Sequence, residues 1–296
     1  MQRVSITLPD GDMSALRFGD SGAPLRLVFC HANGFNAQSY RAIIEPLGIA
    51  ALALDLRGHG RTALPTPVSD LPNWQIFAAD IARVFDQCVD GPVVLAGHSY
   101  GAVSAILALP QIAHHLSGYV GFDPVLVPWL FRTIAATRRG RAYMKRRIPI
   151  ARKAGQRRTE FDSLEAAFKR YQGRGAFKGV PDPVLRNYLE GGLSPTDEGR
   201  VRLACDPAWE QAIFVAQSHD LFEQVPRLPD NSRLIFAGAR GRVSTRSQRG
   251  TLQRLQPRIS VEFEPERAHL FPLHDPDFAG RVLQSVLKRA GQDPRS

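Results

Sequence analysis

The chain has 296 residues, of which 44% are hydrophobic and 22% charged, so it can bury a large core without disulfide or metal cross-links. Its net charge of +10 is local: the segment from Arg138 to Arg158 holds ten Lys and Arg and no Asp or Glu, and the remaining 28 basic and 28 acidic residues cancel. No apolar run of about eighteen residues and no CxxC pair occurs, which excludes a membrane-spanning helix and a cysteine zinc site and favours a cytoplasmic protein with reduced thiols at Cys30, Cys88 and Cys205.

The N-terminal segment predicts a β-hairpin. Residues 3–8 and 15–18 alternate apolar and polar side chains, as half-buried strands do, and the pair Asp10-Gly11 lies between them as a turn. No apolar run follows the first charged residue, so this pattern favours a hairpin over a signal peptide.

Six further apolar runs bounded by turn residues predict strands. The runs LRLVFC, IAALAL and PVVLAG are apolar throughout, which is typical of parallel strands covered on both faces. Helical patterns lie between most of the later runs, for example at 74–88 and 100–109. We therefore expect an α/β fold with a mostly parallel central sheet of about eight strands flanked by helices. The six runs are residues 25–30, 49–54, 93–96, 118–122, 233–237 and 260–263.

The alternation of strands and helices stops between Phe122 and Arg233. A structureless loop of that length is not expected in a compact domain, and helical patterns occur within it at 162–171 and 208–218. We therefore expect a mainly helical cap inserted at 124–230 into a core formed by residues 1–123 and 231–296.

A sharp turn is predicted at Gly97-His98-Ser99-Tyr100-Gly101, between the strand PVVLA and the helical pattern AVSAILAL. In such a turn the serine backbone is strained, and side chains at Gly97 and Gly101 would collide with the strand and the helix. The helix N-terminus favours negative charge beside the serine. Because the pattern GxSxG alone is not specific, the inference depends on this context, and a plain structural turn is the alternative.

Three further segments follow predicted strands, and together with the GxSxG turn they make the chain resemble the α/β-hydrolase family over nearly its whole length outside the cap. HANGF (31–35) stands where the family has its oxyanion loop. DLRGHGRT (55–62) is similar to the DxRGxGxS turn of the family, and AHLFP (268–272) lies where the catalytic histidine is found.

The resemblance implies that Ser99 is the nucleophile, in a nucleophile elbow, and that His269 is its general base. Serine is a weak nucleophile at neutral pH, so an imidazole must accept its proton as it attacks an acyl carbon. The oxyanion hole requires two donors, which the resemblance assigns to the backbone N–H of Tyr100 and to the loop at Asn33 or its neighbour Gly34. The other histidines are interpreted as structural, with His98 and His31 packed beside the site and His59 in the 55–62 turn.

The acid of the catalytic triad departs from the commonest family pattern. The segment after the strand RLIFA (233–237) holds no carboxylate, although the family usually has its acid there. A second family location is the end of the preceding strand, where the sequence has Asp123 before Pro124. We expect Asp123 to hold the tautomer of His269 and to stabilise its imidazolium. The alternatives are a structural role for Asp123 with Asp220 as the acid, or a dyad without any acid.

The expected function is that of a serine hydrolase of carboxylic esters: an esterase, a lipase or a lysophospholipase with a small acyl or lipid-like substrate. The same machinery also serves acyltransferases, lactonases and C–C bond hydrolases, and a fold that has lost turnover would leave a non-catalytic small-molecule or lipid binding protein. Ser99 at the elbow argues against haloalkane dehalogenases and epoxide hydrolases, whose nucleophile is aspartate. No metal spacing or phosphate-binding loop is present, so no cofactor is implied.

The basic segment from Arg138 to Arg158 suggests either an anionic membrane surface or an acidic substrate or acyl carrier as its partner. The alternative is a solvated face of the cap, which is what most charge runs are. Nucleic acid is not the expected partner, because Tyr143 is the one aromatic residue of the segment and the rest of the chain is charge-balanced.

Overall fold

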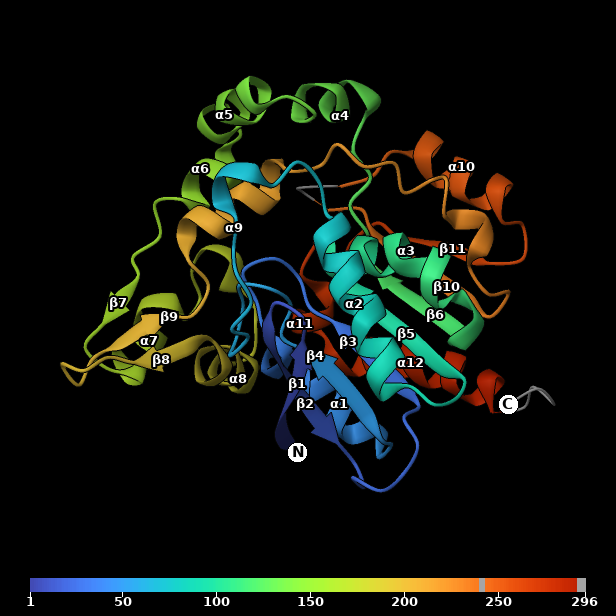
Figure 1. The fold of residues 1–296 in the computed structure, drawn as a ribbon, viewed down its shortest axis with the longest axis horizontal. Helices are drawn as coiled ribbons and strands as arrows, with labels where there is room; N and C mark the ends of the chain where they lie inside the picture. The colour runs from blue at the N-terminus through green and yellow to red at the C-terminus, as the bar shows by residue number, and fades with distance from the viewer. Residues whose placement is uncertain (240–242, 292–296) are drawn as a thin grey trace.

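A computed structural model describes residues 1–239 and 243–291, with Asp70 described through its backbone alone. Its centre is an eight-stranded sheet in the order β1-β2-β4-β3-β5-β6-β10-β11 (Figure 1). The pairs β1–β2 and β2–β4 are antiparallel and the other pairs are parallel, which confirms the predicted fold class. The strands are β1 (Gln2–Leu8), β2 (Gly11–Phe18), β3 (Leu27–Cys30), β4 (Ala51–Leu54), β5 (Val93–His98), β6 (Leu116–Phe122), β10 (Ser232–Ala237) and β11 (Ser260–Glu264).

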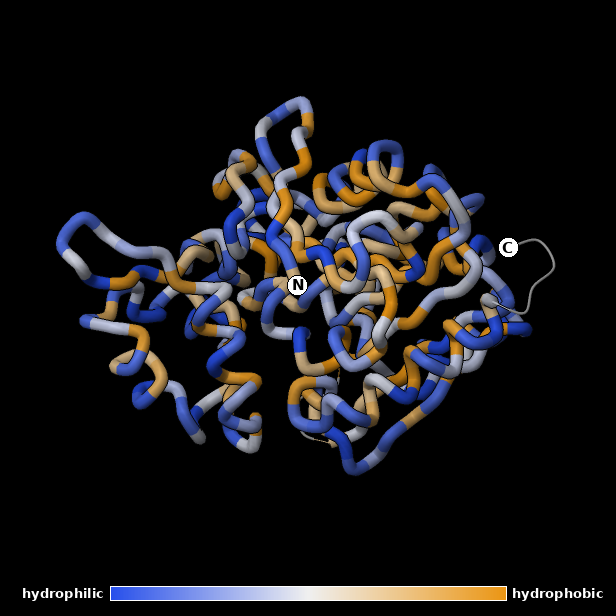
Figure 2. The backbone as a smooth tube through the Cα atoms, turned by 90° about the horizontal axis from the view of Figure 1, so that it is seen from below, coloured by the Kyte–Doolittle hydropathy of each residue, from blue (hydrophilic) through white to orange (hydrophobic). Residues whose placement is uncertain are grey.

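Helices cover both faces of this sheet, as its apolar strands require. Along β3, Val28 and Cys30 enter one apolar cluster, which includes side chains of α2 (Gln75–Cys88) and α3 (Tyr100–Ile112). The alternate residues Leu27 and Phe29 enter a second cluster with α1 (Arg41–Ile44) and α12 (Pro276–Ala290). This burial on both faces is the reason why the parallel strands are apolar throughout. Most outermost turns of the backbone are hydrophilic (Figure 2).

The segment between β6 and β10 is mainly helical, and it also contains a small antiparallel sheet in the order β7-β9-β8 that the sequence analysis did not predict. Its strands are two or three residues long, too short for an alternation pattern to show. The boundaries of the cap at 124 and 230 stay a prediction. The elements are α4 (Trp129–Ala135), α5 (Arg138–Arg147), α6 (Pro149–Ala154), β7 (Glu160–Phe161), α7 (Leu164–Tyr171), α8 (Asp182–Gly192), β8 (Leu193–Pro195), β9 (Val201–Leu203) and α9 (Pro207–Val215).

Two remaining helices lie in the C-terminal part of the chain. They are α10 (Arg246–Leu255), which precedes β11, and α11 (Phe271–His274), which follows it.

The strands β3, β4, β5, β6, β10 and β11 run parallel, so their carboxyl ends meet at one edge of the sheet. The loops that leave this edge carry all of the candidate site residues, and this is the edge where open α/β sheets bind ligands.

Candidate active site

Ser99 lies at the turn from β5 into α3, with a backbone conformation (φ 56°, ψ −122°) that residues with side chains rarely adopt. Its N–H donates to the carbonyl of Phe122 over 2.9 Å, which anchors the turn to β6. A Cβ on Gly97 would lie 2.7 Å from the Cα of Ala102, and one on Gly101 would overlap the carbonyl oxygen of His31. The tight packing that the GxSxG motif predicts is therefore present at both glycines.

His269 follows β11 and lies between Ser99 and Asp123. Its Nε2 is 2.9 Å from the Oγ of Ser99, and its Nδ1 is 2.6 Å from Oδ2 of Asp123. The imidazole is 26% exposed, whereas Asp123 is fully buried and Ser99 nearly so. Three residues that are far apart in the sequence thus form one continuous hydrogen-bonded array.

Asp123 is held at the end of β6 by the neighbouring strand β10. Its N–H donates to Ile235 over 2.7 Å, and its second carboxylate oxygen accepts from the N–H of Ala237 over 3.0 Å. Like Ser99, Asp123 has a positive φ (43°), a backbone conformation that few residues with side chains adopt. Asp220, the alternative acid, instead pairs with Arg132 over 2.5 Å. The structure therefore brings Asp123 to His269, and Asp220 is engaged elsewhere.

The loop after β3 contacts His59 of the 55–62 turn and Glu210 of α9 through Asn33 and Gly34. The N–H of Gly34 donates to Nε2 of His59 over 3.1 Å, so it is occupied. The side-chain amide of Asn33 donates to the carbonyl of Glu210 in α9 over 3.0 Å. Within residues 1–239 and 243–291, the backbone N–H groups of Asn33 and of Tyr100, the first residue of α3, have no hydrogen-bond partner. These two groups remain available to an oxyanion.

Two buried neutral histidines support the loops around the site. Nδ1 of His59 contacts the carbonyl of Arg57 (3.1 Å), which assigns the proton to Nδ1 and leaves Nε2 as the acceptor for Gly34. His31 has the same tautomer, with Nδ1 on the carbonyl of Ala32 and Nε2 accepting from Leu56. Burial lowers the pKa of His59 to about 3 and that of His31 to about 4, so both stay uncharged at neutral pH. Both are structural supports.

A chain of hydrogen bonds through Tyr40 and His98 joins the loop after β3 to the loop of His269. The N–H of Ala32 donates to the Tyr40 hydroxyl (3.0 Å), which lies 2.7 Å from Nδ1 of His98. Nε2 of His98 lies 2.9 Å from the carbonyl of His269. Because a carbonyl oxygen can only accept, Nε2 carries the proton and donates the hydrogen bond. Burial, and then the neighbouring His269, keep the pKa of His98 well below its usual range. The sequence analysis did not identify Tyr40, because no motif marks a residue whose role is set by its neighbours in space.

The segment between β6 and β10, the predicted cap, contacts the loop after β3 at a partly buried ion pair. The guanidinium of Arg157 donates to Glu210 over 2.6 Å and to the hydroxyl of Tyr188 over 2.6 Å. A Cβ on Gly34, whose φ is +77°, would lie 2.6 Å from Oε1 of Glu210. The sequence analysis placed Arg157 in the basic segment, and only the fold shows that it has an acidic partner.

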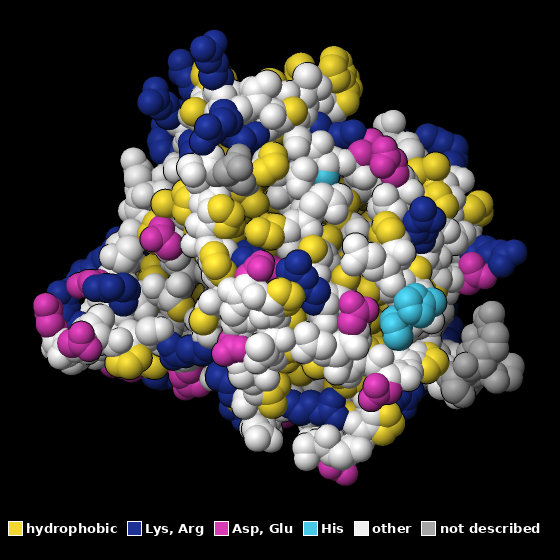
Figure 3. All heavy atoms as spheres, viewed as in Figure 1, with side chains coloured by type: hydrophobic (Ala, Val, Ile, Leu, Met, Phe, Trp, Pro, Cys, Tyr) yellow, Lys and Arg dark blue, Asp and Glu magenta, His cyan; other side chains and the backbone are white. Residues whose placement is uncertain are grey.

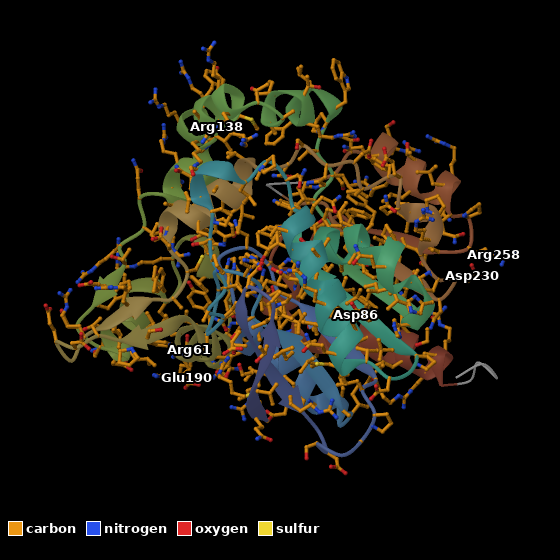
Figure 4. The ribbon with its side chains drawn as sticks, in the orientation of Figure 1. Arg61, Asp86, Arg138, Glu190, Asp230 and Arg258 are labelled. Atoms are coloured by element: carbon orange, nitrogen blue, oxygen red, sulfur yellow. The ribbon has the colours of Figure 1, made fainter. Side chains whose placement is uncertain are left out.

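A second contact of the cap involves the 55–62 turn. The guanidinium of Arg61, labelled in Figure 4, donates to the carbonyl of Leu193 and to the hydroxyl of Ser194 in β8. The indole N–H of Trp209 in α9 donates to the carbonyl of Arg57 over 2.9 Å. The segment between β6 and β10 is thus hydrogen-bonded to the loops that follow β3 and β4.

The described part of the chain shows no group of three or more His, Cys, Asp or Glu side chains able to hold a metal ion. Across the same residues, no helix has the length and apolar character needed to cross a bilayer. The three cysteines are free, with Cys30 and Cys205 buried and Cys88 partly buried.

Comparison with known proteins finds relatives that match part of the chain. The chain is 38% identical over 96 residues to Esterase Rv0045c of Mycobacterium tuberculosis, covering 32% of this chain and 31% of that protein. It is 30% identical over 118 residues to Lipase LipV of the same organism, covering 39% of this chain and 42% of the lipase. The matches therefore span less than half of the length of these relatives.

Solved structures extend the similarity to the complete fold. The crystal structure of E-2-(acetamidomethylene)succinate hydrolase superposes with a TM-score of 0.75 at 19% identity, covering 97% of this chain and all of that one. A family model described as the alpha/beta hydrolase family matches residues 27–280, which include every candidate site residue named above. The chain therefore belongs to the alpha/beta hydrolase family.

Proposed function

We propose that the protein is a serine hydrolase that cleaves carboxylic esters through an acyl-enzyme. The observation that carries this proposal is the hydrogen-bonded array of Ser99, His269 and Asp123, with heavy-atom distances of 2.9 and 2.6 Å. The names of the two relatives, an esterase and a lipase, support the choice of an ester as substrate. Family membership alone would leave the chemistry open, since one fold hosts many activities.

The first half of the reaction forms the acyl-enzyme. Asp123 accepts a hydrogen bond from Nδ1–H of His269, so the lone pair of Nε2 faces the Ser99 hydroxyl. His269 takes the hydroxyl proton as Oγ attacks the acyl carbon, and the carbonyl π electrons move to its oxygen. When the tetrahedral intermediate collapses, the bond to the alcohol oxygen breaks and His269 returns the proton to the departing alcohol. The acyl group is then esterified to Ser99.

The second half repeats these steps with water. His269 accepts a proton from a water molecule that attacks the acyl carbon, and the intermediate collapses to the free carboxylic acid and the Ser99 hydroxyl. In both halves we assign oxyanion stabilisation to the N–H groups of Tyr100 and Asn33. Both are main-chain donors already fixed by α3 and by the loop after β3, so little reorganisation accompanies the charge transfer.

The buried carboxylate of Asp123 is compensated on both oxygens, by His269 and by the N–H of Ala237. A buried charge without such partners would be strongly destabilising. Here the compensation also fixes the orientation of the carboxylate, and through it the plane and tautomer of the imidazole.

Labelling with a fluorophosphonate and hydrolysis of p-nitrophenyl esters test the proposal directly. Ser99→Ala should lose both activities. Ser104→Ala is the matched control: Ser104 lies in the same helix α3, is buried, and its hydroxyl has no hydrogen-bond partner in the described structure. Full labelling of the Ser99→Ala variant would refute the assignment of the nucleophile. A panel of acyl chain lengths, with product analysis in the presence of alcohols, would separate esterase, lipase and acyltransferase activities.

A further inference from the structure

The outer side of the cap exposes apolar side chains on three consecutive helices. Trp129 and Leu130 of α4 are 72% and 55% exposed, Tyr143 of α5 is 58% exposed, and Ile134 and Ile150 also reach solvent. These five belong to the eight large hydrophobic residues that are exposed in the described chain. Such a concentration on one side of a folded protein indicates an interaction site.

The packing of the cap does not require these side chains. The helices α4, α5 and α6 already bury an inner apolar face, in which Ala135, Met144 and Ala151 pack with Val215 of α9. Trp129, Leu130 and Ile134 lie on the opposite, exposed side of α4, which no element of the described structure covers. Helix α4 is thus apolar on two sides, and the described fold buries one of them.

Basic side chains lie beside this apolar group (Figure 3). Six exposed cations lie on α5 and α6, and within the described residues none of them has a carboxylate within ion-pair distance. We call these six and the five apolar residues the cap patch. Lysine and arginine side chains project from the upper left of Figure 3, and hydrophobic side chains lie on the same upper rim. The six cations are Arg138, Arg139, Arg146, Arg147, Arg152 and Lys153.

Basic side chains also line a hollow beside the cap patch. It has a volume of about 280 Å³, and Arg138, Arg141 and Lys145 line it together with apolar side chains. Burial, and then the nearby Arg141, lower the pKa of Lys145. Arg138, which Figure 4 shows on α5, both lines the hollow and is exposed. Cations gathered in this way favour an anion supplied from outside the chain.

We propose that the cap patch docks the protein on the surface of an anionic lipid bilayer. Trp129, Leu130 and Ile134 enter the boundary between headgroups and acyl chains, and the cations of α5 and α6 contact lipid phosphates. A bilayer surface presents an apolar layer and dense negative charge together, which matches both halves of the patch. Nucleic acid lacks the apolar layer. The contact is peripheral and goes beyond the proposed function without depending on it.

Docking would also bring the candidate active site close to lipid substrates. Helix α4 begins six residues after Asp123, so the apolar part of the patch and the candidate triad are joined by the short segment 124–128. An ester released from or held in the bilayer would therefore reach the cap first.

Vesicle co-sedimentation of the full chain tests the proposal. We expect binding to phosphatidylcholine vesicles that contain phosphatidylglycerol, little binding to phosphatidylcholine alone, and loss of binding near 1 M salt, where the Debye length is about 3 Å. Changing Arg138, Arg139, Arg146 and Arg147 to Gln should weaken binding about a hundredfold or more, since each basic residue near an anionic surface contributes roughly fivefold. Trp129→Ser with Leu130→Ser should also weaken it, by removing the apolar contact.

A matched control removes the same charge elsewhere. Arg227, Arg246, Arg254 and Arg258 are exposed on or near α10, and changing these four to Gln should leave vesicle binding within a few-fold of the original. Ser99→Ala should bind vesicles like the unchanged protein, which separates this proposal from that of the ester hydrolase. Circular dichroism checks that each variant is folded.

Several outcomes would overturn the docking proposal. These are absence of binding to the anionic vesicles at low salt, equal binding to neutral vesicles, or equal losses in the patch and control variants. Dimerisation in sedimentation velocity that Trp129→Ser abolishes would assign the apolar face to a second copy of the chain. Binding to poly-glutamate without binding to vesicles would assign the patch to an acidic protein.

Discussion

Nε2–H of His98 donates a hydrogen bond to the main-chain carbonyl of His269, so the residue before the candidate nucleophile holds the loop that carries the candidate base. The other ring nitrogen of His98 contacts the hydroxyl of Tyr40, which in turn accepts a hydrogen bond from the N–H of Ala32. One buried chain of hydrogen bonds therefore connects three loops of the site. We expect this chain to hold His269 at its distance from Ser99.

His98→Ala should lower kcat more than it raises KM, because it frees the His269 loop without removing a group that contacts substrate. The variant leaves the His269 carbonyl and the Tyr40 hydroxyl without their partner, so it should also lower the free energy of unfolding by about 1–3 kcal/mol. Ester hydrolysis and urea unfolding measure the two effects. Tyr40→Phe, which keeps the ring and breaks the chain, should have a smaller effect of the same sign. Unchanged kcat in both variants would contradict a positioning role.

The choice of acid is tested by comparing Asp123→Asn with Asp220→Asn. Asp123→Asn should reduce kcat by up to about ten-thousandfold, by analogy with serine proteases, because an amide cannot fix the same tautomer of His269. Asp220 pairs with Arg132 at a partly exposed position, so its variant should lose less than about 1 kcal/mol of stability and little activity. An inactive Asp220→Asn beside a fully active Asp123→Asn would reverse the assignment.

Gly34→Ala should impair both folding and catalysis, whereas Gly48→Ala should affect folding alone. Both glycines have positive φ (77° and 64°), where a Cβ costs about 1–2 kcal/mol. At Gly48 the added methyl group meets nothing within 4 Å, but at Gly34 it meets the carboxylate of Glu210, which Arg157 holds in place. Thermal unfolding and ester hydrolysis on the two variants separate the backbone effect from displacement of the oxyanion loop. Equal activity of the two variants would argue against a role for this loop.

Acidification should destabilise the fold below about pH 6.5. His31, His59 and His219 are buried, and burial lowers their pKa values to about 4, 3 and 3. Between these values and the ordinary pKa near 6.5, the unfolded chain binds protons that the folded chain does not, so stability falls as the pH falls through this range. Each histidine contributes a slope of about 1.4 kcal/mol per pH unit. Urea unfolding between pH 7 and 4.5 measures the slope. His59→Asn should reduce the slope by the contribution of one histidine. An unchanged slope in that variant would contradict a neutral buried His59.

The fold and the candidate nucleophile and base could be predicted from the sequence because their signals are local. Each depends on a short segment, such as an apolar run bounded by turns or a serine between two glycines, and backbone sterics dictate these residue types wherever the segment is placed. AHLFP after the last strand is another such segment. The absence of a carboxylate after the strand β10 is also a local feature of the sequence, and it makes Asp123 the candidate acid.

The remaining features depend on which segments become neighbours, and the tertiary structure alone decided them. Asp123 reaches His269 because β6 pairs with β10, a register that no local pattern encodes. The N–H of Gly34 is taken by His59 from a turn 25 residues away, which leaves that of Asn33 free. Arg157 pairs with Glu210 of α9, while the six exposed basic residues of α5 and α6 have no carboxylate within ion-pair distance in the described chain. Spacing along a chain specifies backbone geometry, but the partners of a polar side chain follow from packing between distant elements, and packing is a property of the folded molecule.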